Sequence, residues 1–209
     1  MTDDTGTTRW LFADQLGPHF DDGGPLLLIE ARSVFERRTY HRQKAHLILS
    51  ALHHRAAEDP ERVTFVRSQT YAEGVATHRD SSDRDLDAIA ATSRPARRLV
   101  ERLGLSTIHP ERGWFTTPGE FQAWVTGRGD KRLLMEDWYR GVRSRHDVLM
   151  ADGKPEGGKW NFDHDNRLPP PKGETHLPVP TPWQPVEDDI DAQVRQQLDE
   201  WEEIGRAHV

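Results

Sequence analysis

Five side chains near the first apolar runs of the chain have the chemistry to bind a ligand: Asp14, Gln15, Glu30, Lys44 and Ile48. The first three come directly after the apolar runs 10–13 and 26–29, which have the length of buried strands. Ligands of open parallel sheets bind beyond the carboxyl ends of the strands, so these side chains predict a pocket at that edge. The alternative is that both carboxylates bind loop amides and that Ile48 is a core residue.

A second set of candidate residues lies in the segment GGKWNFD, which consists of Gly157, Gly158, Lys159, Trp160, Asn161, Phe162 and Asp163. Paired glycines allow another backbone to approach closely, and the two aromatic rings are large apolar groups in a stretch rich in glycine and proline. Such rings need a surface on which to dock. That surface could belong to another domain or to this same domain, and the sequence leaves both open.

Several kinds of catalytic and metal chemistry are excluded. The chain has no cysteine, so it holds no disulfide, no thiolate zinc site and no cysteine-ligated iron–sulfur cluster within these 209 residues. The nucleophile-elbow, dinucleotide, P-loop and HExxH patterns are missing. The histidines of 41–54 contain no i, i+4 pair, and Arg167 occupies the place in 163–167 where a calcium loop needs an oxygen ligand. We therefore predict no metal site.

Short apolar runs alternate with helical periodicity in the amino-terminal half of the chain. The predicted strands are 10–13, 26–29, 63–66, 88–91 and 107–108, and the predicted helices run from about Tyr40 to Ala57 and between Ser93 and Gly104. No element is predicted between Tyr71 and Asp85. This alternation predicts an α/β fold, a Rossmann-like, doubly wound parallel sheet with flanking helices.

Two further helices are predicted beyond the sheet. The first starts at a capping box, Thr117 to Glu120, with proline at the first helical position, and the second ends near His146. Glycine and proline dominate residues 151–186. We therefore predict a domain over 1–150 followed by an extended interdomain linker over 151–186.

The last part of the chain is acidic. Residues 187–203 contain eight acidic residues and one arginine. Their formal charge of −7 equals the formal net charge of the whole chain. A narrow apolar stripe, formed by Ile190, Val194, Leu198 and Trp201, needs a partner that the linker does not supply, so we expect 187–202 to begin a further helical domain. Residues 203–209, EIGRAHV, match the translation of a common sequencing adapter, and we expect them to be foreign to the native protein.

Composition also argues against a membrane protein. The hydrophobic fraction is 34%, the longest aliphatic run is Leu26 to Ile29, and the acidic start has no apolar signal segment. We predict a cytoplasmic location and no membrane partner.

Four blocks give the chain a family resemblance: Ala13-Asp14-Gln15-Leu16, Tyr40 to Lys44 with Leu49 to Leu52, Met135 to Arg140, and the most specific, GGKWNFDHDNR from Gly157 to Arg167. With these blocks in order, the chain from about Arg9 to Pro171 resembles the amino-terminal half of the bacterial cryptochrome/photolyase-related family, the iron–sulfur photolyases.

The resemblance implies an antenna domain joined by a long linker to a helical domain that binds FAD and a 4Fe–4S cluster, both outside this chain. Family members use light-excited reduced FAD to repair pyrimidine photoproducts in DNA by electron transfer, so this chain alone would hold no catalytic residue. The family's antenna site would place 6,7-dimethyl-8-ribityllumazine near the five residues named first. Residues 30–38 depart from the better-known members, with Val34 where those carry an acidic residue. The family's linker runs beside the DNA, which makes Lys159, Arg167 and Lys172 candidate phosphate contacts.

Three functions are therefore weighed. The first is the antenna domain and linker of a light-driven DNA photolyase or cryptochrome, with the carboxy-terminal FAD domain and damaged DNA as partners. The second is a self-contained module that binds a lumazine or flavin. The third is a ligand-free scaffold that docks a partner through Trp160, Phe162 and the apolar stripe of 190–201.

Overall fold

The chain folds into two units. The structure, a computed structural model, describes residues 6–38, 40–164, 167, 169, 171–173, 179–201 and 204. Unit 1 consists of Met1–Arg112 and Pro185–Val209, and unit 2 consists of Gly113–Gln184. No helix in the described part of the chain is both long and apolar enough to cross a bilayer.

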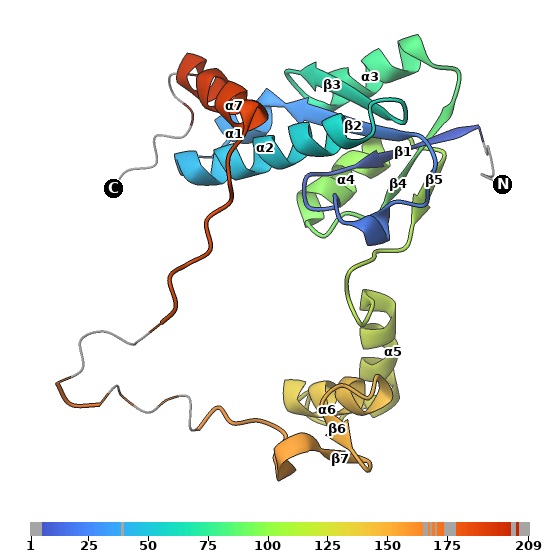
Figure 1. The fold of residues 1–209 in the computed structure, drawn as a ribbon. Helices are drawn as coiled ribbons and strands as arrows, with labels where there is room; N and C mark the ends of the chain where they lie inside the picture. The colour runs from blue at the N-terminus through green and yellow to red at the C-terminus, as the bar shows by residue number, and fades with distance from the viewer. Residues whose placement is uncertain are drawn as a thin grey trace. The chain divides into compact units, whose positions relative to one another are not determined.

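Unit 1 is built on a five-stranded sheet in the order β3-β2-β1-β4-β5, in which every neighbouring pair is parallel (Figure 1). The strands are β1 Thr7–Leu11, β2 Leu26–Ala31, β3 Val63–Ser68, β4 Asp85–Ile89 and β5 Thr107–His109. After β3 the chain crosses back to β4 on the other side of β1, so the order reverses beside β1. This topology confirms the predicted doubly wound α/β fold.

All five predicted strands are present. β1 and β4 each begin three residues earlier than predicted, at Thr7 and Asp85. Polar residues dominate these starts, Thr-Thr-Arg in β1 and Asp-Leu-Asp in β4, so neither gives a continuous apolar run. The prediction was simplest for β2, because all six residues of this strand are buried. A strand of a parallel sheet that is covered on both faces is expected to be a continuous apolar run.

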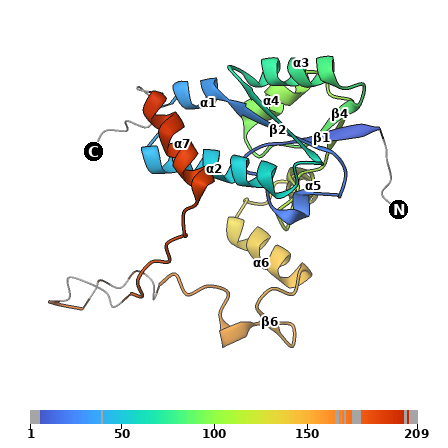
Figure 2. The ribbon, with the colours of Figure 1, turned by 45° about the horizontal axis from the view of Figure 1, so that its top comes forward.

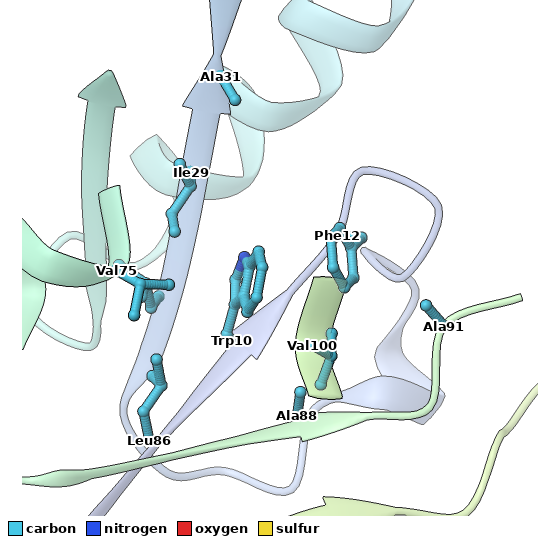
Figure 3. Close-up of a cluster of buried hydrophobic side chains, with 10 residues drawn as sticks. Trp10, Phe12, Ile29, Ala31, Val75, Leu86, Ala88, Ala91 and Val100 are labelled. Atoms are coloured by element: carbon cyan, nitrogen blue, oxygen red, sulfur yellow. The ribbon is translucent and has the colours of Figure 1, made fainter. Parts of the chain in front are cut away.

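Helices cover both faces of the sheet. The helices of unit 1 are α1 Arg32–Glu36, α2 Arg42–Glu58, α3 Tyr71–Ser81, α4 Arg94–Arg102 and α7 Asp189–Glu200, and a 3-10 turn, η1, spans Pro18–Phe20. On one face α2 brings Leu52 to a cluster with Leu11 and Leu28. On the other face, Val75 of α3 and Val100 of α4 pack around Trp10, as Figure 3 shows.

Helix α3 occupies the stretch where no element was predicted. The Thr70 side chain caps it by accepting a hydrogen bond from the Glu73 amide, yet only Gly74, Val75 and His78 are buried. A Cβ atom on Gly74 would lie 2.5 Å from Ile29 Cγ2, so the helix lies very close to β2. A helix that approaches through glycine leaves almost no apolar periodicity in the sequence.

Helix α7 lies against α2 (Figures 1 and 2), and this corrects the expectation of an uncovered stripe. Its apolar residues join a buried cluster with α1 and α2, made of Phe35, Ala45, Leu49, Val194, Leu198, Trp201 and Ile204. The expectation was wrong because α2 has a second apolar face, beside the one that meets the sheet. Ile204 is the one described residue of 203–209; the rest of that segment lies outside the described residues.

Unit 2 contains helices α5 Pro118–Arg128 and α6 Met135–Arg145, strands β6 Met150–Ala151 and β7 Lys154–Pro155, and a 3-10 turn η2 at Glu156–Gly158. The predicted capping box of α5 is present, with Thr117 and Glu120 bonded reciprocally. The predicted linker does not begin as an extended chain, because β6 and β7, at its start, form an antiparallel hairpin. Residues 165, 166, 168, 170 and 174–178 of that linker lie outside the described residues.

Candidate functional site

A cavity of about 970 Å³ lies in unit 1 at the carboxyl ends of β1, β2 and β4. Residues that follow or end these strands line it, among them Asp14, Ala31 and Ala91. Strand order reverses beside β1, and a crevice opens there in doubly wound sheets because the loops on either side diverge. The volume falls within the range of about 300–1,000 Å³ that is usual for small-molecule pockets.

The inner walls of this cavity are apolar. They include Phe12, Ile29, Val34, Ile48, Leu52, Tyr71 and Leu99. The Phe12 and Tyr71 rings meet edge to face, with their centres 5.4 Å apart and their planes at 83°. Burial, reinforced by the Asp14 carboxylate, raises the pKa of the Tyr71 hydroxyl from 10.0 to about 12, so this group can donate a hydrogen bond at neutral pH and remains protonated in moderately alkaline solution. Such walls suit a flat, apolar ring system.

The rim of the cavity is cationic. Five exposed arginines line it: Arg37 and Arg38 just after α1, and Arg94, Arg98 and Arg102 on α4. Asp14 is the one carboxylate among the lining residues, and its Oδ2 accepts a hydrogen bond from Thr92 Oγ1 at 2.8 Å. The sequence reasoning missed these arginines. The spacing of four residues between 94, 98 and 102, on a helix that was itself predicted, is the signal that could have found them.

Of the five predicted pocket residues, the structure brings Asp14 and Ile48 to the cavity. Gln15 is buried behind it: its side-chain oxygen accepts from the Phe12 amide at 3.2 Å, and its amide nitrogen donates to the Ile89 carbonyl at 3.3 Å. Gln15 thus ties the end of β1 to the end of β4.

Glu30 and Lys44 also lie outside the cavity lining. The Glu30 side chain is 3% exposed; its Oε2 lies 2.6 Å from His53 Nε2, and its Oε1 accepts a hydrogen bond from Gln197. These contacts join β2, α2 and α7. Lys44 Nζ lies 5.7 Å from the centre of the Tyr40 ring. A role for these two residues in antenna binding stays a prediction.

The GGKWNFD segment folds onto α6 within unit 2. The Arg140 and Arg143 guanidiniums lie 5.5 Å and 5.7 Å from the centre of the half-buried Trp160 ring, and the Trp160 carbonyl accepts from Arg143 Nη1 at 2.9 Å. Asn161 donates to Glu136 at 3.2 Å. In this structure the segment therefore contacts a helix of its own unit, α6. Docking to another domain stays a prediction.

The remaining residues of that segment are more exposed. Phe162 is 46% exposed, and Asp163 is exposed as well. Gly157 and Gly158 both have φ of +74°, which non-glycine residues rarely adopt, so the pair is explained by the turn it makes. The three candidate phosphate contacts, Lys159, Arg167 and Lys172, are all exposed.

Two comparisons with known proteins identify the family. Residues 9–208 match the family model described as deoxyribodipyrimidine photo-lyase-related protein. The chain belongs to this family. It is also 29% identical over 182 residues to a protein of Agrobacterium fabrum named (6-4) photolyase, and the match covers 76% of this chain and 35% of that relative. This photolyase-related protein therefore spans about a third of the length of the curated relative that it matches.

Among the described residues of this photolyase-related protein, His54, Asp188 and Asp191 form a group whose ligand atoms all lie within 4.8 Å of one another. Both carboxylates already accept backbone hydrogen bonds in the capping box of α7, and His54 Nε2 lies 3.4 Å from Asp191 Oδ2. The group therefore links α2 to the start of α7 through hydrogen bonds and ion pairs.

Two ionic networks in unit 1 of this photolyase-related protein stabilise the turn before β2. Hydrogen bonds from Arg62 lower the pKa of Asp21 to about 2, and Arg55 adds to the shift. Hydrogen bonds from Arg112, with Arg9 as a second donor, hold the pKa of Asp22 far below its usual value. Neither Asp21 nor Asp22 lines the cavity.

Proposed function

We propose that this photolyase-related protein is the amino-terminal, light-collecting part of a DNA photolyase, and that the cavity of unit 1 binds an antenna chromophore such as 6,7-dimethyl-8-ribityllumazine. The observation that carries the proposal is an apolar cavity of about 970 Å³ at the strand ends of a chain that matches a photolyase-related family over residues 9–208.

The chemistry of an antenna makes specific demands on such a cavity. A chromophore that transfers excitation energy has to be held in one orientation and kept from water, which opens other routes for losing that energy. The walls at Phe12, Ile48 and Leu99 would exclude water from a ring, and the protonated Tyr71 hydroxyl would donate a hydrogen bond to it.

The complete protein would carry out the repair. In this proposal a helical, carboxy-terminal domain outside this chain binds FAD and a 4Fe–4S cluster, and light-excited reduced FAD passes an electron to a pyrimidine photoproduct in damaged DNA. The name of the Agrobacterium fabrum relative favours the (6-4) photoproduct as the lesion. The match to 35% of that relative is consistent with a further domain, which would be this chain's partner in the cytoplasm.

The chromophore site is tested by titrating the purified chain with 6,7-dimethyl-8-ribityllumazine and following fluorescence anisotropy. Ile48→Trp places an indole in the cavity and should abolish binding, while Leu47→Trp on the 69% exposed neighbouring position of α2 should not. Far-ultraviolet circular dichroism checks that both variants are folded. Equal binding by the two variants would contradict the proposed site.

The repair activity is tested separately. The chain is co-expressed with the carboxy-terminal region encoded downstream of it, and the complex is illuminated with oligonucleotides that carry either a (6-4) photoproduct or a cyclobutane dimer. We expect light-dependent repair of the (6-4) photoproduct by the complex and none by the chain alone. Repair by the isolated chain, or a locus that encodes no such region, would contradict the proposal.

A further inference from the structure

We propose that the cavity of unit 1 takes a phosphorylated ligand, a planar heteroaromatic ring joined to a tail that ends in phosphate. The inference rests on the proposed function in one respect, that this cavity holds a ring-shaped ligand. The phosphate is a further property of the site, and it follows from the charges at the rim.

The five arginines that line the cavity differ from neighbouring arginines in their ion pairs. In the described part of the chain, no carboxylate forms an ion pair with any of the five rim arginines. Nearby arginines behave differently, since Arg32 of α1 pairs with Glu36 at 2.9 Å and Arg97 of α4 pairs with Glu111 at 2.6 Å. Glu36 and Glu111 thus pair with arginines outside the lining, and Glu101 of α4 forms no ion pair with Arg98 or Arg102.

Helix α4 carries the strongest part of this imbalance. Arg94, Arg98 and Arg102 are four residues apart, so they lie on one face of the helix, where like charges repel each other. Arg94 is also the first residue of the helix, at the end where the backbone dipole disfavours a cation, and the first turn contains no acidic residue. An anion in the cavity would relieve both of these unfavourable interactions.

The shape of the site selects the kind of anion. A cavity with apolar walls is suited to a ring of one small molecule, whereas a nucleic-acid backbone needs an open groove or a convex surface. Guanidinium groups bind phosphate through paired, charge-assisted hydrogen bonds, which an uncharged ribityl tail cannot make. The amino-terminal ends of α3 and α4 also reach the lining, through Thr70 to Ala72 and Ser93 to Ala96, and helix starts favour anions.

Flavin mononucleotide and riboflavin test this proposal, because they have the same ring system and the same ribityl chain and differ only in the terminal phosphate. We expect flavin mononucleotide to bind the purified chain at least about tenfold more tightly at low salt, an advantage that added salt should reduce. Flavin fluorescence measures both affinities.

Variants then assign the effect to the rim. The double variant Arg98→Gln with Arg102→Gln should lower the affinity for flavin mononucleotide by about tenfold or more and leave the affinity for riboflavin unchanged. The matched control is Arg132→Gln, which removes one charge from an exposed position in unit 2 and should change neither affinity. Riboflavin binding shows that each variant is folded.

The possible outcomes separate this proposal from the proposed function. Equal affinities for the two flavins would overturn the phosphate and leave the ligand cavity standing. Failure of both flavins and of 6,7-dimethyl-8-ribityllumazine to bind would overturn both proposals. If a DNA oligonucleotide bound more tightly than flavin mononucleotide and lost its affinity in the double variant, the rim arginines would serve DNA, and the small phosphorylated ligand would be rejected.

Discussion

Leu198 packs α7 against α2. Truncating this side chain measures how much that packing contributes to the stability of unit 1. The side chain is 1% exposed and lies in the cluster with Ala45 and Leu49 of α2. Leu198→Ala removes three carbons, worth about 2.4 kcal/mol at about 0.8 kcal/mol per buried carbon. The cavity left behind adds to this, so we expect the free energy of unfolding to fall by about 3 kcal/mol, within the usual range for such changes.

The assay is urea denaturation of the whole chain, followed by tryptophan fluorescence, since Trp201 belongs to the same cluster. Gln193→Ala on the exposed face of α7 is the matched control and should change stability by less than about 0.5 kcal/mol. A similarly small loss for Leu198→Ala would refute the packing of α7 on α2. The stripe would then need the external partner that the sequence led us to expect.

Three further predictions concern unit 1. Gly74→Ala puts a Cβ 2.5 Å from Ile29 Cγ2, a contact so short that we take the upper part of the overpacking range, about 2–3 kcal/mol; the gain in helix propensity is about 1 kcal/mol, so urea denaturation should show a net loss of about 1–2 kcal/mol. The pKa of Asp21 is lowered to about 2 from 3.8, so its ion pair with Arg62 stabilises the fold above about pH 4, and on the order of 2 kcal/mol should be lost as the pH falls to 2. Burial lowers the pKa of His78 below 6.5; the unfolded chain therefore binds the proton first, and stability should decline as the pH falls below 6.5, with the His78 titration followed by NMR.

Controls make these three predictions decisive. Gly24→Ala, where no atom lies within 4 Å of the added Cβ, should leave stability nearly unchanged, and a loss equal to that of Gly74→Ala would contradict the close approach of α3 to β2. Arg62→Gln should flatten the acid dependence between pH 4 and 2; an unchanged profile would show that Asp21 does not depend on this pair. His78→Phe should remove the decline below pH 6.5, and a decline that persists would assign it to other groups.

The sheet could be predicted from the sequence because its signal is local. A parallel strand covered on both faces is a short apolar run, and β2, with all six residues buried, shows this directly. Helix α3 could not be predicted in the same way. It approaches β2 through Gly74, and the absence of a side chain is what permits the contact, so no apolar stripe marks the buried face.

The functional residues were harder to predict, because polar groups at strand ends have two possible roles. Asp14 reaches the cavity, whereas Glu30 is bound by His53 and by Gln197, a residue 167 positions further along the chain. Which role each carboxylate has is decided by side chains that the fold brings from a distance. The packing of α7 on α2 was not predicted for the same reason. The second apolar face of α2 can be recognised as a contact surface only when α7, from the far end of the chain, is known to lie on it.

The charge of the cavity illustrates this limit most clearly. The chain as a whole carries a formal charge of −7, yet the cavity lining contains five arginines and one aspartate. The acidic residues that dominate the sum lie largely in 187–203, and several of the described ones pair with residues of α2 and α7, such as Asp199 with Arg42. A ligand responds to the potential of the cavity and hardly to the net charge, since the field of distant, exposed carboxylates is screened within about 10 Å at ordinary salt. The proposed class of ligand therefore follows from the segments that the topology places around the strand ends. Helix α4 and the residues just after α1 bring arginines there that form no ion pair within the described part of the chain.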